Sequence, residues 1–227
     1  MVVLCMAIVC HALANAQENP VGNYLQQVGN YADLYNGKME TNYNVAQYSN
    51  LPYYRSTDFT AATIVYRKIY YPNQKVRLDL YKEQLIVSTF DGRYGIILNP
   101  DNVEKVVMYD KTFRWLNPSK ESGLKAGYYI HLSEGKKIQL FRKESYTLWN
   151  NLPPFHFDLN ARYYLLYNNR YYTIRNKSSF SKIFSQHKKQ IKQFAKNAQL
   201  NFKQYPDASL ASLAGYCDEL ITSTNKQ

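Results

Sequence analysis

The side chains best spaced for chemistry are five lysines, and the chemistry they favour is the binding of anions. From residue 178 to residue 198, apolar residues recur at the spacing of one helix. At ~100° per residue, the lysines fill a sector about 120° wide beside the apolar one. Such a flank can contact anionic lipid or phosphate groups, and it can equally be the solvated side of a packed helix. The candidate contact residues are Lys182, Lys188, Lys189, Lys192 and Lys196.

Histidine and cysteine do not occur at the spacings typical of metal or nucleophile sites. His131, His156 and His187 have no histidine, cysteine or carboxylate at ligand spacing, and no HExxH motif occurs. Cys217 falls on the apolar side of a predicted helix, where a core role is more common, and there is no G-x-S-x-G motif. We therefore expect no metal and no cofactor.

The acidic residues give no basis for choosing a catalytic pair. Folding could bring two carboxylates together for hydrolysis, but most of these side chains fall at turns or strand flanks. They are Asp79, Glu83, Asp91, Asp101 and Asp110. The sequence favours a protein that is not an enzyme, with a hydrolase of unrecognised site as one alternative.

The net charge of +11 over 227 residues is unevenly distributed. From Arg170 to the C-terminus there are ten Lys or Arg and three Asp or Glu. This excess favours lipid head groups, polyanionic glycans or other anionic partners. Nucleic acid would suit the charge as well, but a protein outside the cytoplasm seldom meets it, so we expect no nucleic-acid partner.

Residues 1–16 have the pattern of a cleavable signal peptide. An apolar run over residues 2–14 ends in Ala14-Asn15-Ala16, which fits signal-peptidase cleavage before Gln17. The run is too short for the ~20 residues that span a bilayer, so no transmembrane segment is expected after cleavage. Two of the three cysteines lie in this leader, which leaves no disulfide for the mature chain. The prediction is an exported protein of the periplasm or outer envelope.

The mature chain is predicted to be mainly β (α+β). Residues 17–57 form an irregular N-terminal arm with a candidate short helix at 23–35, and residues 58–177 form an antiparallel β domain. Short alternating runs separated by turn residues imply a twisted meander of hairpins, for which a half-barrel and two layers are the alternative shapes. The predicted turns include Pro72-Asn73, a type I′ turn at Asp91-Gly92, and Asn168-Asn169. A Pro-Pro step at residues 153–154 interrupts the pattern.

Residues 178–227 are predicted to form a pair of helices within the same globular unit. The first begins after Ser178 or Ser179, and the second covers about residues 208–221 after an Asp207 cap. Both have one apolar side, so each must pack on the other or on the sheet.

Tyrosine is unusually frequent and often occurs in doublets. The chain has 23 tyrosines, a residue that favours half-buried pleated surfaces. Adjacent rings in a strand point to opposite faces, where they can form a sugar or peptide platform or simply cover the sheet. The doublets begin at Tyr53, Tyr70, Tyr128, Tyr163 and Tyr171.

Two stretches resemble a recurrent block in uncharacterised exported proteins of Gram-negative bacteria. One is TIVYRKIYY (63–71), then VRLDLY (76–81) and EQLIV (83–87). The other is KIF (182–184), KKQIK (188–192) and Phe194, before a second short helix. The resemblance implies an envelope location and β structure followed by helices. This family has no established activity, so the resemblance supplies no functional residues.

The function predicted from these observations is that of a non-catalytic exported envelope protein. It would bind an envelope protein or an anionic lipid or glycan surface. The second alternative, beside the hydrolase, is a carrier that holds a small apolar ligand in a curled sheet.

Overall fold

The computed structural model describes residues 20–29, 32–117 and 122–224. The predicted signal peptide, residues 1–16, lies outside the described residues. No helix in the described part of the chain is long and apolar enough to cross a membrane.

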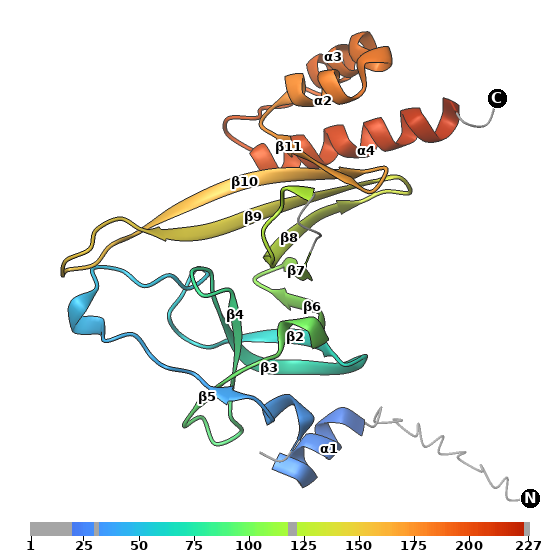
Figure 1. The fold of residues 1–227 in the computed structure, drawn as a ribbon. Helices are drawn as coiled ribbons and strands as arrows, with labels where there is room; N and C mark the ends of the chain where they lie inside the picture. The colour runs from blue at the N-terminus through green and yellow to red at the C-terminus, as the bar shows by residue number, and fades with distance from the viewer. Residues whose placement is uncertain (1–19, 30–31, 118–121, 225–227) are drawn as a thin grey trace, which may run out of the picture.

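The main element is one antiparallel sheet of eleven strands (Figure 1). In chain order the strands are β1 (Lys38–Met39), β2 (Thr60–Tyr66), β3 (Ile69–Asp79), β4 (Gln84–Ser88), β5 (Gly95–Ile97), β6 (Val103–Met108), β7 (Lys111–Leu116), β8 (Gly127–Glu134), β9 (Ile138–Leu148), β10 (Phe157–Tyr167) and β11 (Arg170–Ile174). The spatial order is β1-β5-β4-β3-β2-β6-β7-β8-β9-β10-β11. The sheet order departs from the chain order at two places: β1 pairs with β5 rather than with β2, and β6 pairs with β2 rather than with β5.

Helices lie at both ends of the chain. They are α1 (Pro20–Val28), α2 (Lys177–Ile183), α3 (Lys188–Asn197) and α4 (Pro206–Thr224). The described residues also contain the 3-10 turns η2 (Asp33–Tyr35), η3 (Val45–Gln47), η4 (Pro100–Asn102) and η6 (Ser185–His187). Figure 1 shows α2, α3 and α4 covering the β9–β11 part of the sheet. The predicted mainly-β architecture with C-terminal helices packed on the sheet is confirmed.

The sheet curls until the chain at the end of β3 reaches β9, although four strands lie between β3 and β9 in the sheet order. The backbone N–H of Tyr146 in β9 donates to the carbonyl of Leu80, just after β3 (3.5 Å). Beside this contact the Lys143 ammonium lies 2.5 Å from the Glu83 carboxylate. The sheet is not closed into a barrel.

Buried side chains form separate clusters on the two parts of the sheet. Within the curled part, Ile64, Val76 and Val106 pack with many others, and Leu34 of η2 joins them. Under the helices, Leu140 of β9 packs with a group from β10 and the helices that includes Leu165, Phe180, Ile191 and Leu213.

Three predicted turns have different outcomes. Asn168-Asn169 is confirmed as the β10–β11 turn, with both residues at positive φ. Pro72-Asn73 is not a turn, because it lies within β3 as a bulge where the β2–β3 register shifts, and the chain reverses at Arg67-Lys68 instead. Asp91-Gly92 lies in the β4–β5 hairpin loop, but only Gly92 has positive φ. That loop is closed by the Thr89 N–H to Tyr94 carbonyl bond, so it is longer than a two-residue type I′ turn.

The β9–β10 hairpin is long and projects from the molecule (Figure 1). Its strands stay paired from Ile138 and Tyr167 out to Leu148 and Phe157. Charged residues such as Lys143 and Glu144 conceal the strand pattern in the sequence, but each has an ionic partner in the fold. Residues 47–50 brace the hairpin end, where the Asn50 side chain bonds both backbone groups of Phe157.

Candidate functional site

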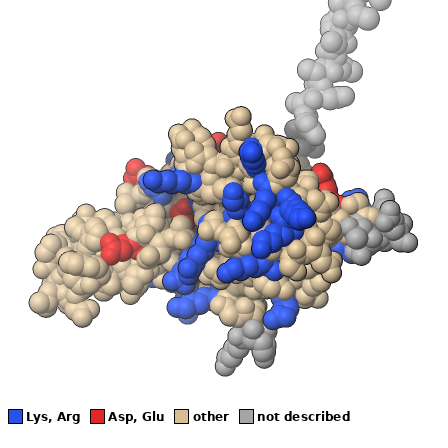
Figure 2. Space-filling model, turned by 90° about the horizontal axis from the view of Figure 1, so that it is seen from above, with Lys and Arg blue, Asp and Glu red and all other residues tan. Residues whose placement is uncertain are grey.

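The C-terminal third of the chain has a surface rich in cations. Residues 159–206 contain ten Lys or Arg and no Asp or Glu. Figure 2, which views the molecule from the side of the helices, shows Lys and Arg side chains gathered there with few carboxylates among them. We call eight of these residues the basic face: Arg162, Arg175, Lys177, Lys182, Lys188, Lys189, Lys192 and Lys196.

The five predicted lysines do not lie on one helix. The predicted helix over 178–198 is divided into α2 and α3, because Phe184 leaves the helical conformation (φ −109°, ψ 58°) and the short η6 turn follows. Phe184 is buried, with its ring centroid 5.2 Å from that of Tyr167, so its packing against the sheet accompanies the break. Lys182 is on α2 and the other four lysines are on α3.

Lysines of α2 and α3 line a shallow hollow of about 660 Å³. Three residues spaced along one side of α3 and one at the start of α2 contribute the cations. The lining residues are Lys177, Lys189, Lys192, Gln193 and Lys196. Lys188 is exposed but does not line this hollow. The fold thus places Lys177 at the same hollow as Lys189, Lys192 and Lys196, three of the predicted contact residues.

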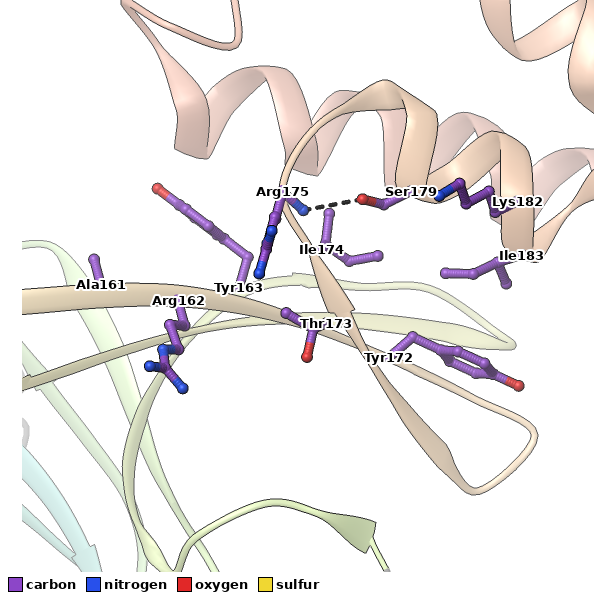
Figure 3. A pocket seen from close by; sticks show the side chains of 10 residues that line it. All are labelled: Ala161, Arg162, Tyr163, Tyr172, Thr173, Ile174, Arg175, Ser179, Lys182 and Ile183. Atoms are coloured by element: carbon purple, nitrogen blue, oxygen red, sulfur yellow. Dashed lines mark hydrogen bonds between the residues drawn. The ribbon is translucent and has the colours of Figure 1, made fainter.

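A second and larger groove, of about 920 Å³, lies where β10, β11 and α2 meet (Figure 3). Its cations are Arg162 of β10, Arg175 after β11 and Lys182 of α2, and no acidic residue lines it. The Ser179 hydroxyl accepts a hydrogen bond from the backbone N–H of Arg175 (3.1 Å) and holds the start of α2 beside the strand. This groove combines positive charge with the apolar Ile183 and the ring of Tyr172.

None of the cations of the basic face forms an ion pair with another described residue. By contrast, Arg77, Arg142 and Lys143 each contact a carboxylate at 2.5 to 2.7 Å. An unpaired cation on an open surface keeps its field available to an approaching anion.

The charge arrangement of α3 opposes helix stability. The helix begins with Lys188 and Lys189, where the macrodipole disfavours positive charge, and no acidic residue stands in the first turn. Lys188, Lys192 and Lys196 also follow at i, i+4 spacing, where like charges repel by about 0.2–0.5 kcal/mol per pair. An anion bound along α3 would relieve both costs.

The histidines and the cysteine occupy separate places in the fold. No group of three or more potential metal ligands occurs among the described residues. His131 is stacked on Phe141 in the sheet, with ring centroids 4.9 Å apart, and burial lowers its pKa. Cys217 lies on α4 and is buried in the cluster between the helices and the sheet, and burial raises the pKa of its thiol to about 12.

The acidic residues considered for catalysis do not converge on one cleft. Asp79 is buried and accepts hydrogen bonds from the Tyr43 hydroxyl (2.8 Å) and from two backbone N–H groups. Glu83 is held by Lys143 and by the backbone N–H of Tyr128. Asp91 bonds Thr89 within its own loop. These carboxylates support the fold where they stand.

The tyrosine doublets mainly cover the sheet. Both members are buried at residues 53–54 and 128–129, whereas at 70–71 one ring is exposed and the other buried. The doublets at 163–164 and 171–172 are half-buried.

Sequence reasoning missed three cations of the basic face: Arg162, Arg175 and Lys177. A signal for them existed, because the stretch without acidic residues begins at residue 159. Only the β10–β11 hairpin, which returns the chain to the start of α2, shows that these cations join the predicted lysines.

Comparison of this chain with protein-family models, with curated proteins and with solved structures finds no match.

Proposed function

We propose that this protein is a non-catalytic exported envelope protein that binds an anionic partner through its basic face. The observation that carries the proposal is the set of eight cations without a described ionic partner. Surface residues that only aid solubility are usually mixed in sign, whereas residues 159–206 are of one sign.

Two hollows give this surface the shape of a binding site. The lysine-lined hollow on α3 and the groove at β11 both belong to the basic face. A partner with several negative charges can engage both, and its association would be steered by the positive field and weakened by salt.

The proposed location rests on the leader-like residues 1–16. The alternatives of a small-ligand carrier and of a hydrolase stay predictions. Because side chains such as Tyr71, Leu78 and Val106 pack within the curled part of the sheet, we place the binding site on the outer surface.

The test is binding of the chain from residue 17 onward to three anionic probes. These are poly-L-glutamate, heparin, and vesicles containing phosphatidylglycerol. The three probes distinguish an acidic protein, a sulfated glycan and a lipid surface as the class of anionic partner. The variant replaces Lys188, Lys189, Lys192 and Lys196 by Gln, and we expect at least about tenfold weaker binding to the preferred probe.

A matched control removes the same number of charges elsewhere. Four exposed lysines outside the basic face are replaced by Gln: Lys38, Lys68, Lys75 and Lys125. If both variants lose affinity equally, the net charge accounts for binding and the basic face is not a site. If the wild-type chain binds none of the probes, the proposal fails.

A further inference from the structure

The basic face includes an open edge of the sheet. β11 is the last strand in the sheet order and pairs on one side with β10. No described strand pairs with its other side. Edge strands present unpaired backbone N–H and C=O groups, to which an extended chain can add.

The register identifies which backbone groups face outward. The two-residue turn Asn168-Asn169 makes Tyr167 and Arg170 the first pair of the hairpin, which exchanges hydrogen bonds. Since bonded pairs alternate along an antiparallel ladder, Tyr172 and Ile174 also direct their backbone groups toward β10. Tyr171 and Thr173 therefore direct theirs to the open edge.

The groove lies at the C-terminal end of this edge, where residues 172–174 of β11 line it. Thr173 is exposed and lines it, together with the cations Arg162, Arg175 and Lys182. Figure 3 shows β11 below α2, with Ile183 of α2 on the same side of the groove as Tyr172. Backbone groups, positive charge and apolar side chains thus meet along one short strand.

We propose that an extended polypeptide segment bearing acidic side chains pairs with the open edge of β11 as a twelfth strand. Its backbone bonds the N–H and C=O groups of Tyr171 and Thr173, and its carboxylates lie against Arg162, Arg175 and Lys182. This inference rests on the proposed function and names its partner as a protein segment.

A second copy of the same chain fits this edge less well. Two copies joined there would bring six groove cations together without an acidic residue in the lining. Like charges across neighbouring strands are destabilising. An acidic segment meets the same edge with opposite charge.

The experiment measures amide hydrogen exchange by NMR on the chain from residue 17 onward. The probe is an eight-residue peptide of alternating Glu and Val, and the control peptide has Lys in place of Glu. We expect the acidic peptide to slow exchange at Tyr171 and Thr173 by about tenfold or more at saturation, because their N–H groups become bonded. The Lys peptide should leave both amides unchanged.

Two substitutions at one position separate backbone pairing from simple attraction. Thr173→Pro removes an N–H that faces the open edge and should weaken peptide binding by about tenfold, while Thr173→Val retains the N–H and should bind as the wild type does. If Thr173→Pro does not fold, exchange in the wild type still decides. Unchanged exchange at Tyr171 and Thr173 with the acidic peptide bound overturns the inference.

Further outcomes distinguish this inference from the proposed function. If poly-L-glutamate binds through the α3 lysines while the peptide leaves Thr173 unprotected, the proposed function stands and strand addition is wrong. If the free protein dimerises and protects Thr173 as its concentration rises, the edge serves a second copy and the inference is wrong.

A pair of single substitutions tests the charge of the groove. Lys182→Gln should weaken peptide binding more than Lys188→Gln, which removes the same charge outside the groove.

Discussion

Cations in two regions of this molecule have opposite surroundings. At the contact between β3 and β9, Lys143 is largely buried and lies against Glu83. On α3, Lys192 and its neighbours are exposed and have no ionic partner among the described residues. The buried cation is neutralised within the folded structure, whereas the exposed ones form no ion pair with any described residue. This difference separates residues that hold the fold from residues available to a partner.

The pKa shifts follow the same division. Burial lowers the pKa of Lys143 and raises the pKa of Glu83, and the attraction between the two charges opposes both shifts. A pair taken out of water in this way depends on both members, because either charge alone would be left without a counterion.

The largest expected effect comes from Lys143→Met, which leaves the Glu83 carboxylate buried without its partner. The free energy of unfolding should fall by about 3–5 kcal/mol, measured by urea denaturation. The double variant Lys143→Met with Glu83→Gln should recover most of that loss, since no buried charge remains and the Gln side-chain carbonyl can still accept from the Tyr128 N–H. A single variant as stable as the wild type would show that the pair does not hold the β3–β9 contact.

Next in size is Asp218→Ala in α4. The Asp218 carboxylate accepts three backbone N–H groups of the β8–β9 turn, from Lys136, Lys137 and Ile138, at 2.7 to 2.9 Å. Their loss should cost about 2–4 kcal/mol of unfolding free energy. Its exposed neighbour provides the control: Glu219→Ala should stay within about 0.5 kcal/mol of wild type. Equal effects of the two substitutions would contradict this role of Asp218.

A smaller effect concerns pH and His131. Burial, with a contribution from Arg114, lowers the pKa of His131 below its ordinary value of 6.5. As pH falls below 6.5, the unfolded state takes up this proton before the folded state does, so the His131 contribution to stability declines until the folded pKa is passed. The decrease in Tm between pH 7.5 and pH 5.5 should therefore be smaller for His131→Phe than for the wild type. An unchanged decrease would exclude His131 as its source.

The smallest effect on stability is expected for replacement of the α3 lysines, which should have the largest effect on binding. Replacing Lys188, Lys189, Lys192 and Lys196 by Gln removes the like-charge repulsion and the unfavourable dipole interaction of α3. The free energy of unfolding should stay the same or rise by up to about 1 kcal/mol, while affinity for the anionic probe falls. A clear loss of stability would show that these lysines support the fold and would remove the contrast with Lys143.

Local patterns in the sequence determined the class of fold. Alternating apolar residues indicated strands such as the second part of β3, residues 75–79, because a strand with one buried face must repeat every two residues. The Asn168-Asn169 turn followed from the tolerance of asparagine for positive φ. The apolar stripe of α4 likewise required a packing partner, which the sheet supplies.

Tertiary contacts decided what local patterns did not contain. No glycine or proline marks the helix break at Phe184 in the sequence. The break coincides with the packing of the Phe184 ring against the sheet, which is a tertiary contact. Charged residues fill the extended part of β9 because partners distant in sequence, such as Glu83, neutralise them there. Part of the candidate site could be predicted and part could not. The lysines of α3 lie on one helix, so their spacing in the sequence predicts that they lie together. Arg162, Arg175 and Lys182 come from a strand, a connection and a helix, so only the folded chain brings them to one groove.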